Sequence, residues 1–207
     1  RTHKLMDADL KSPLSDGAPS AFHPAPCSAF PPVLDVCCGP RQMWFDKKHP
    51  MALYHDRRSE KVEWETHETQ PDGSKKYRHR TMEIAPDVVG DFTALDFPDD
   101  TFHLIAFDPP HFDTLNENAR TAKIYGRLFG DWETMLADGF RECFRVLKPC
   151  GTLIFKWNAH DIPLERVLAL SPHPPLFGHT TGRQAKTHWV AFCKPNIPAL
   201  PTASANL

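Results

Sequence analysis

Four short apolar segments of the chain each end in an aspartate, and this series restricts the fold more than any other feature. The four acids are Asp35, Asp56, Asp91 and Asp108. Short apolar runs that stop at polar or turn residues are typical of buried strands. Helical and loop segments separate these runs, and alternation of strand and helix favours a mostly parallel sheet covered on both faces. Parallel strands bring their carboxyl ends to one edge, where we expect the four acids to meet.

The other segments complete a single α/β domain over residues 31–195. The predicted strands cover residues 33–38, 52–56, 87–89, 102–107, 152–155 and 187–192. Apolar residues at helical spacing predict a helix over residues 135–147, and a short helix is expected over 162–170. Residues 112–130 are predicted to form a polar loop. Residues 1–30 are expected to be a flexible or cofactor-covering segment, and residues 196–207 a flexible tail.

Residues 61–84 differ from the rest of the domain. Alternating residues on both sides of the turn signal Pro71-Asp72-Gly73 predict a β-hairpin inserted after the second strand. One arm is acidic, and the other is basic through Lys75, Lys76, Arg78 and Arg80. Cross-strand ion pairing would explain this pattern in structural terms. Contact of the basic arm with nucleic acid is the functional alternative.

Composition limits the function classes. The net charge of -2 and the sequence pI near 6.7 argue against a protein held on nucleic acid by bulk positive charge, although a local basic patch remains open. The six cysteines form no C-x-x-C pair and no histidine pair has zinc-ligand spacing, so no metal site is expected. No apolar run approaches the ~18 residues of a membrane span, and no apolar signal segment is present. These features predict a cytoplasmic protein with no membrane partner.

The first strand and the turn after it resemble a known motif. Residues 33–41 read V-L-D-V-C-C-G-P-R, which is similar to the first motif of class I, Rossmann-like S-adenosylmethionine-dependent methyltransferases, D-x-G-x-G-x-G. Asp35 and Gly39 match the acid and the second glycine. Cys37 and Arg41 replace the other two glycines. Arginine adopts a positive φ only at a cost, so the turn at Arg41 is expected to differ from the usual one. The resemblance implies a cofactor-binding turn made by Asp35, Cys37, Cys38 and Gly39.

The same family assigns roles to the acids that end the next strands. Asp56 lies 21 residues after Asp35, the spacing expected for an acid that binds the ribose hydroxyls of the cofactor. Asp91 and Phe92 would contact the adenine ring, and Asp108 is grouped with the cofactor-binding residues. The resemblance therefore implies S-adenosyl-L-methionine as the cofactor. The fold class it implies is a mostly parallel, doubly wound sheet with an antiparallel last strand.

The segment from Asp108 to Phe112 reads D-P-P-H-F. It resembles the D-P-P-Y/F/W motif of amino-methyltransferases, including small phage and bacterial DNA adenine N6-methyltransferases. The resemblance implies a catalytic set of Asp108, Pro109, Pro110 and His111. An aryl amine is a poor nucleophile because its lone pair is delocalised, and the Asp108 carboxylate and Pro109 carbonyl could each accept one of its N–H groups. His111 stands where the stacking aromatic is usual, with Phe112 next to it.

Further residues are expected to contact the substrate. They are Lys156 and Trp157 at the end of the fifth strand, Lys75, Lys76 and Arg78 on the hairpin, and Arg183 and Lys186 near the last strand. Residues 177–189 mix basic, aromatic and glycine residues, as in a loop that grips a nucleic-acid backbone. A simple hairpin before the last strand is the structural alternative.

The expected function is methylation of an exocyclic amino nitrogen of a nucleic-acid base, with low sequence specificity. Adenine N6 in DNA is the preferred target. Low specificity, or a partner subunit, is expected because no large insertion provides a target-recognition domain. RNA, a protein side-chain amide or a small-molecule amine are alternative substrates. A catalytically silent binding subunit is another alternative, which the loss of two motif glycines favours and the intact Asp108-Pro109-Pro110 disfavours. DNA is the preferred partner over RNA, and a homodimer is left open.

Overall fold

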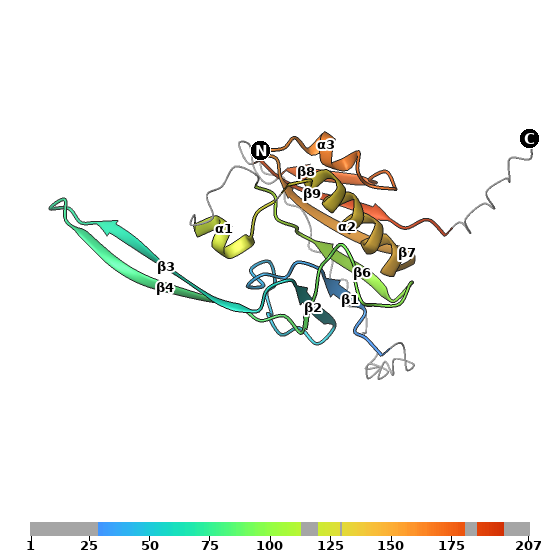
Figure 1. The fold of residues 1–207 in the computed structure, drawn as a ribbon, viewed down its shortest axis with the longest axis horizontal. Helices are drawn as coiled ribbons and strands as arrows, with labels where there is room; N and C mark the ends of the chain where they lie inside the picture. The colour runs from blue at the N-terminus through green and yellow to red at the C-terminus, as the bar shows by residue number, and fades with distance from the viewer. Residues whose placement is uncertain (1–28, 113–119, 129, 181–185, 197–207) are drawn as a thin grey trace, which may run out of the picture.

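The computed structural model describes residues 29–112, 120–128, 130–180 and 186–196, and its centre is a seven-stranded sheet (Figure 1). The strands are β1 (Val33–Asp35), β2 (Ala52–Asp56), β5 (Val88–Val89), β6 (Phe102–Phe107), β7 (Leu147–Asn158), β8 (Phe177–Thr180) and β9 (Thr187–Cys193). Their order is β5-β2-β1-β6-β7-β9-β8. The first five pair in parallel, whereas β9 runs antiparallel to both β7 and β8. The expected Rossmann-like sheet with an antiparallel last strand is confirmed.

Strand β1 lies at the point where the chain changes direction across the sheet. From β1 the chain passes to β2 and β5 on one side, then returns to β6 on the other side. In sheets of this kind, ligands bind at the carboxyl ends of the strands beside this switch point. The ends of β1, β2 and β6 are therefore the place to search for a site.

A two-stranded hairpin between β2 and β5 projects as a long arm away from the sheet (Figure 1). Its strands are β3 (Glu60–Thr69) and β4 (Lys75–Ile84), which confirms the predicted insertion. The Gly73 N–H donates to the Gln70 carbonyl, and Gly73 has φ 83°, a conformation that glycine adopts without strain. Glu68 of β3 and Arg78 of β4 form an ion pair at 2.9 Å. Such cross-strand pairing is the structural explanation given above for one acidic and one basic arm.

Three helices occur in the described part of the chain: α1 (Arg120–Tyr125), α2 (Trp132–Val146) and α3 (Leu164–Leu168). The described part of α1 falls in the segment predicted to be a polar loop. That prediction is wrong there because Ala122 and Ile124 are buried, and Ile124 packs with Val62 and Ile84 at the base of the hairpin. Residues 36–51 cross from β1 to β2 through turns instead of a helix.

Helix α2 packs its apolar side on the sheet. Its buried Phe140 and Phe144 meet the rings of Phe107, Phe155 and Phe192 at centroid distances of 4.9–6.0 Å. Full burial of one such ring contributes about 1.5–3 kcal/mol relative to exposure. Asp131 caps the helix by accepting the Thr134 N–H at 3.1 Å. This packing holds β6 and β7 rigid beneath their carboxyl ends.

Strand β7 is longer than the predicted strand over residues 152–155. It begins at Leu147, directly after α2, and the pairing with β6 shifts between Phe102–Leu147 and Leu104–Thr152. Residues 148–151 form a bulge inside the strand, where Cys150 has φ 61°. Helix α2 itself ends at Val146, one residue before the end predicted for it.

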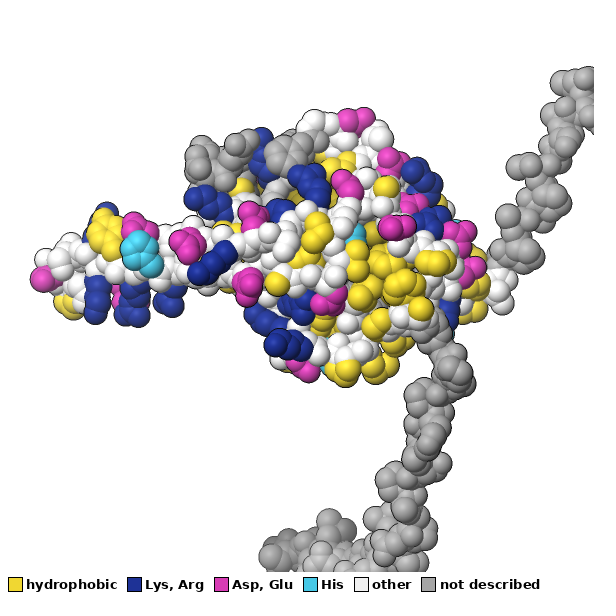
Figure 2. All heavy atoms as spheres, turned by 60° about the horizontal axis from the view of Figure 1, so that its bottom comes forward, with side chains coloured by type: hydrophobic (Ala, Val, Ile, Leu, Met, Phe, Trp, Pro, Cys, Tyr) yellow, Lys and Arg dark blue, Asp and Glu magenta, His cyan; other side chains and the backbone are white. Residues whose placement is uncertain are grey.

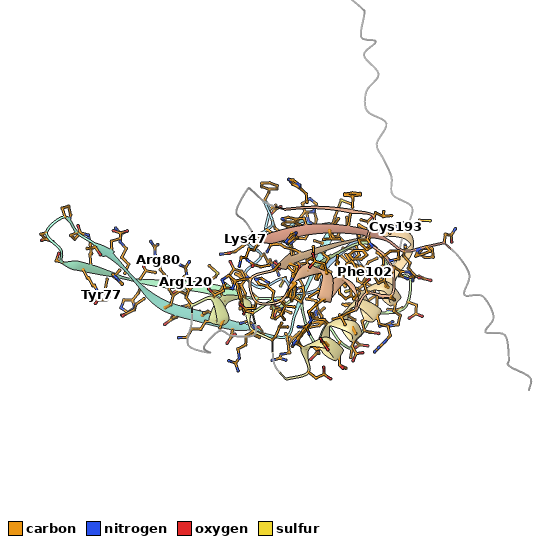
Figure 3. The ribbon with its side chains drawn as sticks, turned by 90° about the horizontal axis from the view of Figure 1, so that it is seen from above. Lys47, Tyr77, Arg80, Phe102, Arg120 and Cys193 are labelled. Atoms are coloured by element: carbon orange, nitrogen blue, oxygen red, sulfur yellow. The ribbon has the colours of Figure 1, made fainter. Side chains whose placement is uncertain are left out.

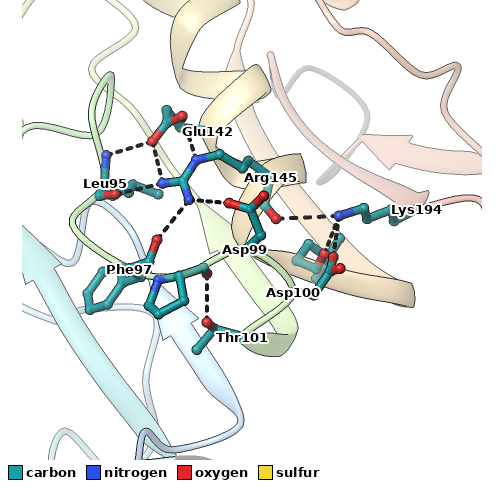
Figure 4. Close-up of polar contacts among 10 residues, drawn as sticks. Leu95, Phe97, Asp99, Asp100, Thr101, Glu142, Arg145 and Lys194 are labelled. Atoms are coloured by element: carbon teal, nitrogen blue, oxygen red, sulfur yellow. Dashed lines mark hydrogen bonds and ion pairs between the residues drawn. The ribbon is translucent and has the colours of Figure 1, made fainter. Parts of the chain in front are cut away.

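An arginine and a lysine join the end of α2 to the loop before β6 and to the end of β9 (Figure 4). Arg145 donates to Glu142, Asp99 and the carbonyls of Leu95 and Phe97, and Lys194 donates to Asp100 and the carbonyls of Arg145 and Leu147. The Arg145 carbonyl in the last turn of α2 also accepts the Asp100 N–H at 3.0 Å, so Lys194 adds a second donor there and joins the end of β9 to the end of the helix. These contacts lie at the opposite end of β6 from the predicted site.

Candidate active site

A cavity of about 470 Å³ opens at the carboxyl ends of β1, β2 and β6. This is the edge where the sequence places its series of acids. Its size lies within the range of small-molecule sites, about 300–1,000 Å³. The lining residues are Cys37, Cys38, Gly39, Pro40, Gln42, Met43, Asp56, Arg57, Arg58, Phe92, Asp108, Pro110, Ala122, Tyr125, Gly126, Arg127, Met135, Lys156 and Trp189.

The turn after β1 forms one wall of the cavity. Gly39 has φ 48°, and a Cβ placed there would meet nothing nearer than the Ile124 carbonyl at 4.0 Å. Arg41 also has a positive φ, 56°, although it replaces a motif glycine. Its guanidinium is held by the carbonyls of Lys47 (2.7 Å) and Ala85 (2.6 Å) and lies 3.7 Å from the Tyr54 ring centroid. These contacts offset the backbone strain, so the turn keeps a left-handed residue without glycine.

Two cysteines of this turn face the cavity. Burial raises the pKa of Cys38 to about 12 and also raises the pKa of Cys37. Both side chains are therefore neutral thiols near pH 7. They act as small apolar groups in the wall rather than as nucleophiles.

Asp56 links the end of β2 to this turn. Its Oδ2 accepts the Gly39 N–H at 2.8 Å, and its Oδ1 accepts the Arg58 N–H at 2.9 Å. The side chain lines the cavity although only 9% of its area is exposed. Two carboxylate oxygens offer about four acceptor positions. Asp56 therefore shapes the turn and still has acceptor capacity toward the cavity.

Asp35 does not line the cavity. It is fully buried, and its Oδ2 accepts the Trp44 indole N–H at 2.6 Å. Burial raises the pKa of Asp35 to about 7, although the Trp44 hydrogen bond acts in the opposite direction. The structure thus places Asp35 behind the turn, where it holds residue 44.

The pair Asp91-Phe92 is divided between two environments. Phe92 lines the cavity, and its ring meets Phe107 edge-on at 5.5 Å. Asp91 is exposed outside the cavity lining, and its Oδ1 accepts from the Thr93 N–H (2.9 Å) and hydroxyl (2.8 Å). Only Phe92 of the two is positioned to pack on a ligand in the cavity.

Asp108 lies at the end of β6 with its two oxygens in different situations. Oδ2 accepts from Lys156 Nζ at 2.5 Å. Oδ1 is buried, and no described residue donates a hydrogen bond to it. A buried acceptor without a donor costs free energy, about 1–3 kcal/mol. Asp108 therefore carries, in a residue that lines the cavity, a buried acceptor without a described donor, and its Oδ1 lies 4.0 Å from His111 Nδ1.

The residues after Asp108 are held by local contacts. Pro110 lines the cavity, whereas Pro109 is buried and its carbonyl lies 3.2 Å from His111 Nδ1. Burial lowers the pKa of His111, so the imidazole is neutral near pH 7 and can donate from Nδ1 to that carbonyl. Its ring packs 4.5 Å from Phe112 and 5.9 Å from Trp157. His111 thus lies outside the cavity lining.

The end of β7 separates two residues that the sequence grouped together. Lys156 lines the cavity, but the Trp157 side chain is fully buried and donates to the Ile162 carbonyl at 3.0 Å. Successive strand residues face opposite sides of a sheet. Trp189 of β9 is paired with Lys156 and also lines the cavity, with Lys156 Nζ 5.7 Å from its ring centroid. Sequence reasoning missed Trp189 as a site residue.

Three arginines of the cavity lining were also missed: Arg57, Arg58 and Arg127. The Arg58 guanidinium donates to the carbonyls of Lys123 and Ile124, both at 2.9 Å, and so joins the end of β2 to α1. Arg57 and Arg58 directly follow Asp56 in the sequence. This R-R pair after the strand-ending acid was the signal that could have identified them.

The other predicted substrate contacts lie outside this cavity. Lys75, Lys76 and Arg78 are exposed on the hairpin, and Lys186 is exposed just before β9. Arg183 lies outside the described residues. Strand β8 pairs with β9. In the part described, residues 177–189 therefore contain the hairpin that was the alternative to a loop gripping nucleic acid.

Two further features concern metal and membrane. In the described ranges, no three His, Cys, Asp or Glu side chains lie together in a way that would hold a metal ion. None of the helices in the described part of the chain has the length and apolar character that a membrane span requires.

Comparison with known proteins gives no match to a protein-family model and none to a curated protein. Among solved structures, the PH0226 protein of Pyrococcus horikoshii is 16% identical to this chain and has a TM-score of 0.48. The alignment covers 79% of this chain and 81% of the PH0226 chain. A S-adenosylmethionine-dependent methyltransferase of Methanosarcina mazei is 12% identical over 79% and 92% of the two chains, with a TM-score of 0.43. A 16S rRNA (adenine(1408)-N(1))-methyltransferase of Catenulisporales acidiphilia is 13% identical over 81% and 86%, with a TM-score of 0.40. At these identities the likeness concerns the fold alone.

Proposed function

We propose that this chain is an S-adenosylmethionine-dependent methyltransferase that acts on an exocyclic amino nitrogen of a nucleic-acid base. The preferred target is adenine N6 in DNA. The observation that carries the proposal is the buried Oδ1 of Asp108 in the D-P-P segment, which accepts no hydrogen bond from the described residues and belongs to a side chain that lines a cavity at the switch point of the sheet. An acceptor in that position suits a substrate that brings an N–H donor.

The residues of the cavity fit S-adenosylmethionine. Asp56 retains acceptor capacity for the two ribose hydroxyls, and the Gly39 turn lets a ligand approach the backbone closely. Phe92 offers an apolar ring for packing on adenine. Arg57, Arg58 and Arg127 supply positive charge for the amino-acid carboxylate. When bound, the cofactor supplies an electrophilic methyl group on a sulfonium.

Asp108 would orient the substrate amine. Its Oδ1 accepts one N–H, which turns the nitrogen lone pair toward the methyl group and stabilises the positive charge that develops on nitrogen. The Pro109 carbonyl, the proposed acceptor of the other N–H, lies 3.2 Å from His111 Nδ1; it keeps a second lone pair, although Pro109 is buried outside the cavity lining. The neutral His111 therefore supports the carbonyl instead of stacking on the substrate.

Trp189 is an aromatic side chain of the cavity lining that can stack on the substrate ring. It lines the cavity next to Lys156, whereas His111 and Trp157 do not line it. Indole stacking on a planar base contributes about 1–3 kcal/mol and tolerates different bases. We therefore assign to Trp189 the role that the sequence gave to His111.

The test is incubation with methyl-labelled cofactor and, separately, DNA, RNA, protein or free nucleosides, followed by digestion and identification of the labelled group. Label on adenine N6 of DNA is the expected result. Label on another base amine would keep the mechanism and correct the base. Label on protein or RNA alone would replace the substrate, and no label on any acceptor, with cofactor bound, would favour a silent binding subunit.

A further inference from the structure

The hairpin register sorts the basic residues of β4 onto two faces. Lys76, Arg78 and Arg80 are paired with Glu68, Thr66 and Trp64. Residues opposite each other across a hairpin share a face, and alternate residues along one strand share it too. We call the face that carries Lys76, Arg78 and Arg80 the basic face. Lys75, Tyr77 and His79 lie on the other face with Lys61. Figure 2 shows Lys and Arg side chains gathered along one side of the arm.

The cations of the basic face are exposed and only partly neutralised. Arg78 pairs with Glu68 at 2.9 Å, but within the described residues neither Lys76 nor Arg80 has an acidic partner. The whole chain has a net charge of -2, so this concentration of cations is local rather than general. Unpaired exposed cations in a row favour an extended polyanion over a single small anion.

The basic face leads back to the cavity through α1. At the root of the arm, the Arg120 guanidinium lies 5.2 Å from the Trp64 ring centroid, which adds a cation to the same face. Along the arm, Arg80 lies between Tyr77 toward the tip and Arg120 at the root (Figure 3). Ile124 packs against the hairpin root, while Ala122 and Tyr125 of the same helix line the cavity. One short helix therefore separates the basic face from the site.

From this arrangement we infer that the basic face of the hairpin binds the sugar–phosphate backbone of DNA and guides the strand past α1 to the cavity. The choice of DNA rests on the function proposed above. Phosphate contacts of this kind position a substrate without reading its sequence. The other face, with Lys61, Lys75, Glu63 and Glu65, takes no part in binding. This separates Lys75 from Lys76 and Arg78, with which sequence reasoning grouped it.

The test compares two double variants of the chain, each of which removes two positive charges. Lys76→Gln/Arg80→Gln changes the basic face, and Lys61→Gln/Lys75→Gln changes the opposite face. Affinity for a short fluorescein-labelled DNA strand is measured by anisotropy over a range of salt concentrations, without cofactor. Each lost phosphate contact lowers the slope of log affinity against log salt by about 0.7 for a single strand. We expect a fall of roughly 1.4 for the first variant and none for the second.

Equal slopes for the two variants, or no DNA binding by the parent protein, would overturn the inference. Two competitors test whether DNA is the ligand. If polyglutamate displaces the labelled DNA as effectively as unlabelled DNA does, the assignment to DNA is overturned. Binding of an RNA strand by a protein that does not bind DNA would overturn it as well. Circular dichroism checks that both variants fold. Methyl transfer is assayed separately, so a protein that binds DNA by this face but labels no base would refute the proposed function alone.

Discussion

Lys156 Nζ lies 2.5 Å from Asp108 Oδ2 across the neighbouring parallel strands β6 and β7. The pair holds the carboxylate so that its other oxygen, Oδ1, is the one left without a donor among the described residues. The lysine is partly exposed and has Trp189 on its other side. Under the proposed function we therefore expect Lys156 to be a positioning residue that fixes which oxygen of Asp108 meets the substrate.

Replacing Lys156 with Met should lower turnover by about tenfold, because a carboxylate free to rotate loses part of its orientation for transfer, and tenfold corresponds to ~1.4 kcal/mol. Cofactor affinity should change little, as measured by calorimetry. Lys148→Met, on the same strand but near its other end, is the matched control. Equal turnover of the Lys156 variant and the control would assign the ion pair a structural role only.

Replacing Asp108 with Asn should lower turnover by roughly 10²–10³ while cofactor affinity is kept. Asn preserves the shape of the side chain, but it removes the negative charge and can turn a donor toward the substrate amine. Rates at saturating cofactor, with calorimetry of cofactor binding, separate the two effects. Loss of cofactor binding would instead move Asp108 into the cofactor pocket.

Trp189→Ala should raise the KM for the nucleic-acid substrate more than it lowers kcat, because stacking acts on substrate binding, at about 1–3 kcal/mol per base. Trp189→Phe keeps an aromatic face and should recover most of the affinity. Steady-state rates over a range of substrate concentrations measure the split. An alanine variant with the parent KM would leave the cavity without an assigned stacking residue.

Asp56→Asn should weaken cofactor affinity by about 1–3 kcal/mol, because the amide replaces one acceptor oxygen with a donor. Either the contact with Gly39 or the contact with Arg58 must then be lost. The exposed Asp96→Asn is the control. Titration calorimetry gives both affinities, and an unchanged Asp56 variant would remove this acid from the cofactor site.

The sequence predicted the features of the fold that depend on local pattern. The strand over residues 102–107 has the predicted bounds because apolar residues stop there at Asp108-Pro109, and the hairpin follows from its turn signal and alternation. Helix α1 was missed because Ala122 and Ile124 are two apolar residues in a polar segment. Their burial depends on the hairpin root, which is distant in the sequence.

The cavity could be predicted at its strand ends but not across its far wall. Asp56 and Asp108 line it, as their positions at strand ends indicate. Which of Lys156 and Trp157 faces the cavity depends on the phase of the strand, and both were named. Trp189 enters the site through its pairing with Lys156, which only the β7–β9 register determines. Such non-local pairing is not encoded in a short motif.

The last prediction concerns the buried acid Asp35 and the pH dependence of stability. Burial raises its pKa to about 7 in the folded protein from an ordinary value of 3.8. Between about pH 4 and about pH 7, the folded state therefore keeps a proton that the unfolded state has released. Stability must fall as pH rises through this window, by on the order of 4 kcal/mol in total. Asp35→Asn cannot ionise and can still accept the Trp44 hydrogen bond, so its advantage over the parent should grow from pH 4 to pH 7. Denaturant unfolding of both proteins at several pH values measures this difference, and parallel curves would show that Asp35 has the same pKa in the folded and unfolded states, so that burial does not raise it.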